Sequence, residues 1–222
     1  MPDALIVHGG WAGHEPAACA KIIADLLRVE GFSVTVTDDF GAFGDPAVHR
    51  LSLVVPVITR ASIDRAVLRN LVAAVESGVG LAGQHGGLAG SFREAVDFHF
   101  VCGCQWVAHP GDIIPFRVDV TRPDDPIMAG IDGFDYLSEQ YYLHVDPAVE
   151  VLATTTFSGE HAPWTKGVVM PVVYKKHYGA GRVFYSALGH APAEFEHPQM
   201  REILRRGLKW AARRPDEMRS DV

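Results

Sequence analysis

The chain has 222 residues, of which 48% are hydrophobic and 21% charged, and its 27 acidic and 20 basic side chains give a formal net charge of −7. This composition excludes an intrinsically disordered chain, and a domain of this length buries roughly 70% of the surface that its unfolded form exposes. The acidic balance repels phosphate backbones, so nucleic acid is not an expected partner. The longest run without Asp, Glu, Lys or Arg, at residues 77–92, is rich in glycine and too short and polar to cross a membrane.

The cysteines and the N-terminal residues predict a cytoplasmic protein. Cys19, Cys102 and Cys104 are odd in number and share one C-x-C spacing, which gives no disulfide framework and suits a reducing compartment. Met1-Pro2-Asp3 leads directly into an apolar run, without the basic segment and cleavage site of a secretory leader. We therefore expect a cytoplasmic location and no membrane partner.

The first half of the chain alternates short apolar runs with segments of helical periodicity. Four strands are expected, at residues 4–7, 32–37, 51–55 and 79–82. Pro56 is expected to stop the third of them. Three helices are expected, at residues 16–31, 63–78 and 91–98. The last helix is predicted because Ser91 and Glu94 have the spacing of a capping box.

The second half of the chain is richer in alternating, β-branched segments. Strands are expected at residues 113–120, 149–156, 168–177 and 183–188. Residues 136–144 are expected to form a polar and aromatic loop, and the apolar positions between Met200 and Ala211 predict a C-terminal helix. The charged residues 213–222 are expected to fray, and the irregular middle, residues 102–163, could serve as a contact in a homo-oligomer.

This order of elements predicts one α/β domain that spans residues 1–222. Strand-helix alternation with short connections favours a mostly parallel central sheet with helices on both faces and some antiparallel strands. In such open sheets, ligands bind beyond the carboxyl ends of the strands, near the point where the strand order reverses.

Three of the expected strands are followed by a histidine next to glycine, at His8, His85 and His190. If the sheet is parallel there, the three imidazoles face one crevice. The adjacent Gly9, Gly10 and Gly86 allow the backbone to approach a ligand closely. The alternative for any one of them is a histidine that caps a carbonyl or lies at the surface.

Common nucleotide, hydrolase and zinc motifs are absent or misplaced. Residues 78–83 match G-x-G-x-x-G, but they enter a strand where the phosphate-binding motif should leave one, and neither a P-loop nor G-x-S-x-G is present. Cys102 and Cys104, with His99 and His109 nearby, lack the C-x-x-C spacing of a zinc knuckle and are expected to be buried apolar residues.

The turn at residues 83–87, Gly-Gln-His-Gly-Gly, lies where a class I glutamine amidotransferase has its nucleophile elbow. The exposed position of that elbow holds a cysteine in those enzymes and His85 in this chain. A histidine cannot form the thioester that amide hydrolysis by this route requires, so glutaminase activity is excluded on chemical grounds.

Several segments in a fixed order resemble the ThuA-like (trehalose utilisation) family. They are His8-Gly9-Gly10 with His14 after it, residues 80–87, residues 103–110, residues 135–142 and residues 178–190. The resemblance covers nearly the whole chain and implies a flavodoxin-like, class I glutamine-amidotransferase-like fold. Two positions depart from the family pattern. Cys104 stands where the family often has glycine, and Ala191 stands where it often has an aspartate that could help to hold substrate.

The resemblance implies a role in carbohydrate metabolism, with a disaccharide such as trehalose, or a keto-sugar, as the small-molecule partner. Possible reactions are the isomerisation, elimination or hydrolysis of that sugar. A non-catalytic sugar-binding or regulatory module remains an alternative, as does a metal-dependent hydrolase of another small substrate.

The candidate site combines the strand-end histidines with a carboxylate and aromatic rings. The residues expected to be catalytic are His85, His190 and Glu139. The residues expected to bind substrate are His8, Gly9, Gly10, Trp11, His14, Gly86, His109 and Tyr141. Glu139 and Tyr141 are included because sugar sites commonly combine a carboxylate with stacking rings, although the Tyr141–Tyr142 pair could instead fill the edge of the core.

Two mechanisms fit these residues. His85 or His190, with Glu139, could move protons beside a carbonyl, because imidazoles titrate near neutral pH. Alternatively, histidines and one carboxylate could hold a zinc-like divalent ion, although there is no H-x-H or H-E-x-x-H signature. The sequence leaves the choice between these open.

Overall fold

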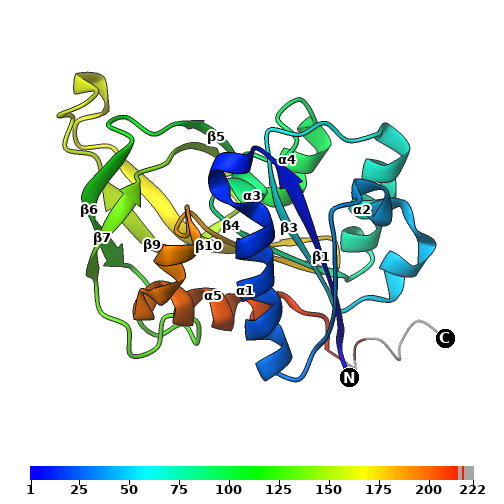
Figure 1. Cartoon of the computed structure of the whole chain (residues 1–222). Helices are drawn as coiled ribbons and strands as arrows, with labels where there is room; N and C mark the ends of the chain where they lie inside the picture. The colour runs from blue at the N-terminus through cyan, green and yellow to red at the C-terminus, as the bar shows by residue number, and fades with distance from the viewer. Residues whose placement is uncertain (215–216, 218–222) are drawn as a thin grey trace.

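One large sheet carries most strands of the protein. The computed structural model describes residues 1–214 and 217 (Figure 1). The strands are β1 (Asp3–Gly10), β2 (Ser33–Thr37), β3 (Leu53–Thr59), β4 (Gly80–Gln84), β5 (Cys104–Ala108), β6 (Ile113–Val120), β7 (Phe134–Glu139), β8 (Tyr142–Val145), β9 (Glu150–Thr156), β10 (Val169–Tyr178) and β11 (Gly181–Ser186). Within the described residues, nine of them form a sheet in the order β2-β1-β3-β4-β11-β10-β9-β6-β7, and β5 pairs with β8 alone.

The sheet has a parallel half and an antiparallel half. Neighbouring strands from β2 through β1, β3 and β4 to β11 pair in parallel. From β11 onward, β10, β9, β6 and β7 pair antiparallel, as do β5 and β8. The strand order reverses between β1 and β3, which is where an open α/β sheet of this type binds ligands.

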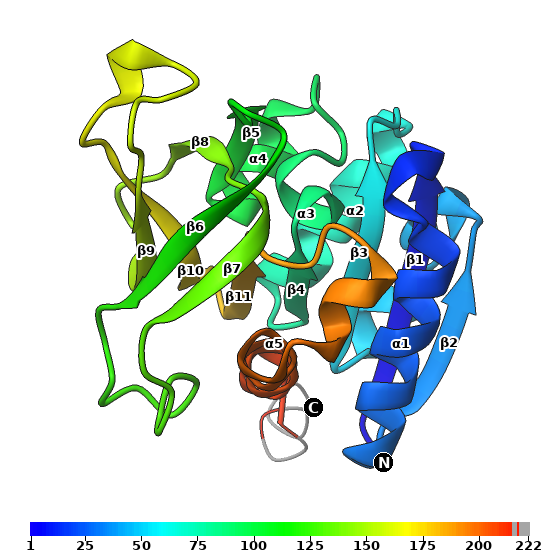
Figure 2. The same cartoon turned by 60° about the vertical axis from the view of Figure 1, so that its left-hand side comes forward.

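Helices cover both faces of the parallel half (Figure 2). The helices α1 (Pro16–Val29) and α5 (Pro198–Ala211) pack on one face and contact each other. The helices α2 (Arg65–Glu76), α3 (Gly86–Ala89) and α4 (Val96–Cys102) lie on the other. The prediction of an α/β fold with a central sheet between helices is confirmed.

Burial explains the apolar runs of the parallel half. Every residue of β3 and of β4 is buried, as expected of parallel strands that are covered on both faces.

Short 3-10 helices connect the larger elements: η1 (Ala12–His14), η2 (Phe40–Gly44), η3 (Pro46–Arg50), η4 (Pro163–Thr165) and η5 (Pro192–Glu196).

Pro56 does not stop β3, which continues to Thr59. The ladder between β3 and β4 covers only Leu53 and Val54, so Pro56 lies where β3 is paired with β1 alone. A strand paired on one side tolerates proline because its missing N–H need not break a ladder.

The capping-box prediction is also wrong, because no helix covers residues 91–95. The Ser91 hydroxyl is buried and donates to the carbonyls of Ile58 and Gly87, at 2.9 and 2.8 Å. It therefore ties the end of β3 to α3, and α4 begins only at Val96.

The loop expected at residues 136–144 is instead the end of β7 followed by β8. In β7, Tyr136 and Ser138 are buried while Leu137 is 61% exposed. Burial therefore alternates along residues 136–138, as it does in a strand. Because the buried residue is a serine and the exposed one is a leucine, the hydrophobic pattern of the sequence does not predict this strand.

The C-terminal tail begins inside the fold. Arg213 is buried and donates to the carbonyl of His49 at 2.7 Å. The remainder of the predicted tail, at residues 215–216 and 218–222, lies outside the described residues. None of the described helices combines the length and hydropathy that a bilayer crossing requires.

Candidate active site

Three histidines and one glutamate converge at the carboxyl ends of the parallel strands. We call His14, His85, Glu139 and His190 the His/Glu cluster; one ligand atom from each lies within 4.8 Å of all the others. Glu139 Oε2 lies 3.0 Å from His85 Nε2, 3.4 Å from His190 Nδ1 and 4.0 Å from His14 Nε2. The structure thus places the predicted catalytic trio together and adds His14 to it.

His85 occupies the tight turn between β4 and α3 that the sequence predicted. Its φ of 49° and ψ of −133° are unfavourable for a non-glycine residue. Two contacts hold it there: its N–H donates to the Ser186 carbonyl at 2.6 Å, and the Tyr185 hydroxyl donates to its carbonyl at 3.1 Å. The turn therefore points the imidazole into the cluster from the centre of the sheet.

His14 enters the cluster from η1, just after β1. Its Nδ1 is 2.9 Å from Thr59 Oγ1 at the end of β3, so both sides of the strand-order reversal contribute to its position. Gly86 leaves room for this contact, since a Cβ there would lie 2.6 Å from Thr59 Oγ1 and 2.7 Å from His14 Cε1. Gly86 is consequently a packing requirement of the cluster.

His190 is held by Glu194, a residue that the sequence did not single out. Glu194 Oε2 accepts the backbone N–H groups of Gly189 and His190, at 3.1 and 3.0 Å. The same carboxylate accepts the hydroxyls of Tyr136 and Ser138 in β7, at 2.6 and 2.9 Å. Glu194 in η5 thereby connects the loop after β11 to the antiparallel half of the sheet.

Glu139 ends β7 and brings its carboxylate from the antiparallel half into the cluster. The buried ring of Tyr141 follows two residues later and stacks on His85, with centroids 4.0 Å apart and an angle of 28° between the planes. This contact fixes the plane of the His85 imidazole.

The charges of the cluster are strongly coupled. Burial opposes the ionisation of Glu139, but hydrogen bonds with His190 and His85 outweigh it and hold the pKa of the carboxyl well below its ordinary value. The hydrogen bond to Glu139 outweighs burial at His190 and raises its pKa. Burial, followed by the neighbouring His85 and His190, lowers the pKa of His14 to about 3. Glu139 is thus an anion facing a neutral His14.

The nitrogen Nε2 of His85 lies so close to Glu139 and His190 that a positive charge is required between these groups. The Nδ1 of His85 is 2.9 Å from the Ala187 carbonyl and must donate to it. In the neutral ring this leaves Nε2 as a bare acceptor, yet Nε2 lies 3.0 Å from the Glu139 carboxylate and 3.2 Å from His190 Nδ1. Either a proton or a cation must compensate for this close approach of acceptors.

A small cavity borders the cluster. Its volume is about 10 Å³, close to the least that holds one water molecule, and its lining includes His14, Gln84, His85 and His190. His14 Nε2 and Gln84 Oε1 are buried without a hydrogen-bond partner among the described residues. Unpartnered buried polar atoms are costly, so this arrangement suits a small polar occupant.

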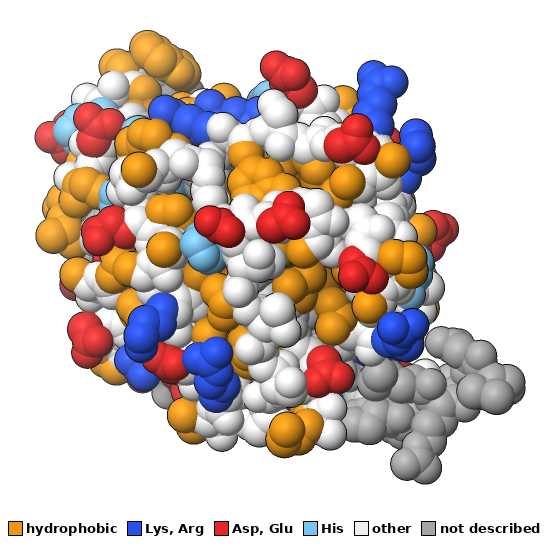
Figure 3. Space-filling view, turned by 45° about the vertical axis from the view of Figure 1, so that its right-hand side comes forward, with side chains coloured by type: hydrophobic (Ala, Val, Ile, Leu, Met, Phe, Trp, Pro, Cys, Tyr) orange, Lys and Arg blue, Asp and Glu red, His pale blue; other side chains and the backbone are white. Residues whose placement is uncertain are grey.

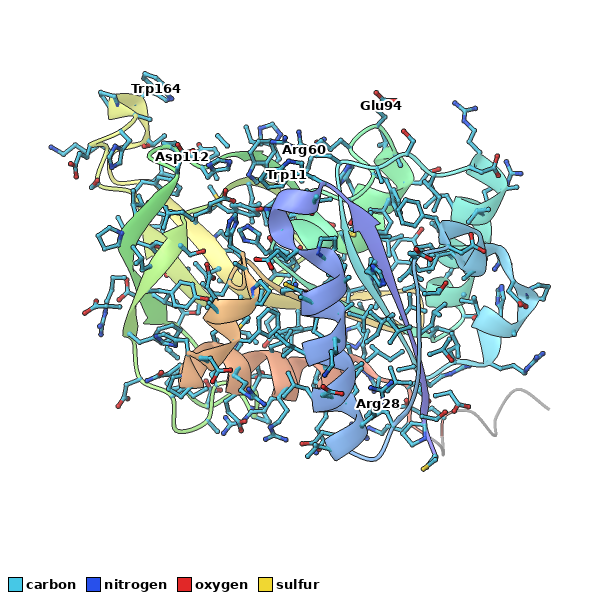
Figure 4. The ribbon with its side chains drawn as sticks, viewed as in Figure 1. Trp11, Arg28, Arg60, Glu94, Asp112 and Trp164 are labelled. Atoms are coloured by element: carbon cyan, nitrogen blue, oxygen red, sulfur yellow. The ribbon has the colours of Figure 1, made fainter. Side chains whose placement is uncertain are left out.

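Two other predicted residues lie at the rim of the cluster. Trp11, labelled in Figure 4, is 40% exposed. Its ring meets His14 edge-on, with centroids 4.7 Å apart. His109 Nε2 is 3.7 Å from Glu139 Oε1, and its Nδ1 is 3.2 Å from the Asp112 carboxylate.

His8, Gly9 and Gly10 do not join the cluster. Among the described residues, no hydrogen bond, ion pair or ring contact connects the His8 side chain to it, because His8 lies within β1, which continues to Gly10. A Cβ at Gly10 would lie 2.0 Å from the Thr59 carbonyl, so glycine there serves the close pairing of β1 with β3. Strand-end spacing alone could not distinguish His8 from the later His14.

A family model described as ThuA, trehalose utilisation, matches residues 3–211. Two solved structures of ThuA-like proteins, from Bacteroides uniformis and Parabacteroides merdae, each align with a TM-score of 0.77 and 18% identity, over 95% of this chain and 91% and 90% of theirs. A cytoplasmic protein from Salmonella typhimurium aligns with a TM-score of 0.63 and 14% identity, over 96% of this chain and 100% of its own. At these identities the likeness concerns the fold. No curated protein matches the chain.

Proposed function

Because this chain belongs to the ThuA family, whose model is described as trehalose utilisation, we propose that it is a cytoplasmic enzyme of carbohydrate metabolism that acts on a small sugar at the His/Glu cluster. A disaccharide or a keto-sugar is the proposed substrate class. The observation that carries the proposal is the buried Glu139 carboxylate among three imidazoles. The cytoplasmic location is supported by the description of the similar Salmonella protein.

The donor set fits a divalent, zinc-like ion. Neighbouring ligand atoms of a tetrahedral zinc site with bonds of about 2.0–2.1 Å lie about 3.4 Å apart. The corresponding distances among His85 Nε2, His190 Nδ1 and Glu139 Oε2 are 3.0, 3.2 and 3.4 Å, and His14 Nε2 lies farther away, 4.0 Å from Glu139 Oε2. The Ala187 carbonyl at His85 Nδ1 and the Thr59 hydroxyl at His14 Nδ1 are the outer partners that metal-binding histidines usually have. We therefore propose that His14, His85, Glu139 and His190 hold the ion.

A bound ion of this kind polarises a carbonyl oxygen or acidifies a water molecule. The chain's own residues orient the substrate around it. Tyr141 fixes the His85 ring by stacking, and the exposed indole of Trp11 offers an apolar face to a sugar ring. His109, which is half-buried, reaches Glu139 Oε1 from the solvent side and is placed to bind a hydroxyl.

The second candidate is proton transfer without a metal. It is favoured by one observation, the contact between His190 Nδ1 and Glu139 Oε2, which raises the pKa of His190. A proton held on His190 beside an ionised Glu139 forms an acid-base pair next to the substrate.

The test is a thermal-shift screen of untagged protein against neutral disaccharides, monosaccharides and their 3-keto forms, each with and without EDTA, together with a measurement of bound metal. A ligand at about 100 times its Kd stabilises by roughly 2.7 kcal/mol, which is several degrees in a domain of this size. We expect stoichiometric metal and a sugar-dependent shift that EDTA removes. A shift that survives EDTA in metal-free protein would favour the acid-base pair.

Product formation separates an enzyme from a binding module. We expect the sugar that shifts Tm to be converted by the wild-type protein and not by the His85→Ala variant. Binding without product would identify a sugar-binding module, and no shift with any sugar would contradict the carbohydrate assignment.

A further inference from the structure

Two arginines beside the His/Glu cluster lie on tryptophan rings and have no carboxylate partner. The Arg60 guanidinium is 5.0 Å from the centre of the Trp11 ring, and that of Arg93 is 4.2 Å from the centre of the Trp106 ring. Among the described residues, neither forms an ion pair or a side-chain hydrogen bond, and Arg93 Nε is buried without a partner. Both guanidiniums therefore lack an acidic partner in a chain with net charge −7.

The two arginines also oppose each other electrostatically. Burial, followed by the nearby charge of Arg60, lowers the pKa of Arg93. Arg60 and the half-buried Arg93 carry like charges, and holding these charges close together costs free energy. Stacking of the guanidiniums on indole rings offsets this cost only in part. An anion bound between them would compensate for that cost.

The backbones of both arginines are fixed by the fold. Arg60 has a φ of 56°, unusual for a non-glycine residue, and its N–H donates to the Gly90 carbonyl at 2.9 Å. Its partner Trp11 packs over Gly13, where a Cβ would lie 2.3 Å from the indole. Figure 4 shows Trp11 and Arg60 together at the end of β1. The carbonyl of Arg93 accepts the amide of Gln105 in β5 at 3.2 Å.

Aromatic rings connect both arginines to the cluster: one ring, Trp11, for Arg60, and two rings, Trp106 and Tyr141, for Arg93. Trp11 contacts His14, and Trp106 lies 5.4 Å from His109 and 6.2 Å from Tyr141, centroid to centroid. Ring contacts therefore connect both Arg-Trp pairs to the proposed substrate site. Arg60 and Arg93 themselves both line a groove of about 770 Å³, a size typical of small-molecule sites.

The groove has an apolar floor and charged walls. Ile63, Leu68 and Phe92 contribute apolar surface, and Arg65, Arg69, Glu94 and Asp97 are exposed along its length. Figure 3, which turns the side of α2 toward the viewer, shows apolar side chains between acidic and basic ones. Neither Glu94 nor Asp97 pairs with Arg60 or Arg93 among the described ion pairs, so both guanidiniums remain available to a ligand.

We infer that the substrate of this site is an anionic sugar, whose carboxylate or phosphate group binds between Arg60 and Arg93 while its reacting end lies at the His/Glu cluster. This inference rests on the proposed function and narrows its substrate class. Guanidinium groups recognise both carboxylate and phosphate with paired N–H donors, so the two chemistries share the same determinant.

The test compares glucose, glucuronate and glucose 6-phosphate as probes, with Kd measured by calorimetry on the protein as purified. We expect at least one anionic probe to bind about tenfold or more tightly than glucose, as befits a charge-assisted hydrogen bond. Arg60→Gln and Arg93→Gln should each remove most of this preference, and Arg60→Lys and Arg93→Lys should retain part of it. The two anionic probes distinguish a sugar acid from a sugar phosphate.

Arg28→Gln is the matched control, because it changes the net charge equally at the opposite end of the molecule (Figure 4). It should keep the anion preference. A preference that survives the double variant, or that Arg28→Gln reduces equally, would overturn the inference. If glucose binds as well as both anionic probes, the inference is wrong and the proposed function stands. If no probe binds, the inference is contradicted, and the proposed function is decided separately by the screen of disaccharides and keto-sugars.

Discussion

The parallel and antiparallel halves of the sheet contribute different chemistry to one site. The parallel half supplies the three imidazoles, all from loops that follow β1, β4 and β11. The antiparallel half supplies the Glu139 carboxylate and leads into the Tyr141 ring, and the separate β5–β8 pair supplies Trp106. Neither half holds a complete cluster, so any activity of the cluster depends on how the two are joined.

The joint between the halves is itself polar and buried. Glu194 binds the loop after β11 on one side and the side chains of β7 on the other. Strand pairing joins β10 to β11, but this carboxylate sets the position of His190 relative to β7. The His/Glu cluster thus carries the chemistry, whereas Glu194 aligns the two halves of the sheet that contribute to the cluster.

Removal of the charge from the antiparallel half should have the largest effect. Glu139→Gln keeps the shape of the side chain but removes the anion that faces His85 and His190. We expect kcat to fall by roughly 10²–10⁴-fold and the bound metal to be lost. Assays use the sugar found in the thermal-shift screen, with metal measured in parallel. Glu160→Gln, at an exposed position, should leave both unchanged. Full activity in Glu139→Gln would refute the proposed site.

Removal of the hydrogen-bond partner of His14, in the parallel half, should have an intermediate effect on metal affinity. Thr59→Val removes the hydroxyl at His14 Nδ1 while keeping the volume of the side chain. Loss of an outer partner of a metal-binding histidine typically costs about 10–100-fold in metal affinity or activity. Titration with zinc would measure this change. Thr59→Ser should restore the affinity, and an equal loss in Thr59→Ser would show that packing, not the hydroxyl, matters here.

Substitution of Glu194, which joins the two halves, should lower the stability of the fold more than it lowers the activity. Glu194→Gln replaces one acceptor oxygen by an NH₂ group that faces N–H or O–H donors. We expect a loss of about 1–3 kcal/mol, or a Tm lower by several degrees. Calorimetric melting would measure it, with Glu196→Gln as the exposed control on the same 3-10 helix. An unchanged Tm would mean that strand pairing alone aligns the halves.

The smallest effect should come from a network of surface charges on α5. Hydrogen bonds from Arg205 outweigh partial burial and, with Arg206, lower the pKa of Glu202 in α5 from 4.5 to about 2. A carboxyl with a lowered pKa stabilises the fold above its unfolded value, and this contribution disappears as the pH falls from about 4.5 to about 2. Glu202→Gln should therefore lower Tm slightly at pH 7, by an amount that shrinks in that window, because exposed pairs contribute about 0–1 kcal/mol. A pH-independent difference would point to a cause other than this charge. The kcat should not change.

The two halves also differ in how far the sequence predicts them. The parallel half follows simple rules: apolar runs end in turns, and the ends of parallel strands meet. These rules predict that His85 and His190 lie close together, and His85 Nε2 is 3.2 Å from His190 Nδ1. They failed for His8 because β1 continues beyond it, which leaves His14 to enter the cluster.

In the antiparallel half the rules are weaker. Glu139 was expected in a loop and is the last residue of a strand, because β7 buries Ser138 and exposes Leu137. Glu194 carried no signal at all, since its role depends on partners in β7 that are more than fifty positions away. Whether Arg60 and Arg93 have acidic partners likewise depends on their three-dimensional surroundings, which the sequence does not show.

The position of β11 has a consequence for folding. This strand comes last among the described strands in chain order, yet it lies between β4 and β10 in the middle of the sheet. Until residues 181–186 have left the ribosome, β4 and β10 each present an open edge, and unpaired edges invite misassembly. The long sequence separation between β4 and β11 also predicts slow folding. During synthesis the imidazole of His85 and the carboxylate of Glu139 therefore come together only when almost the whole chain has been made.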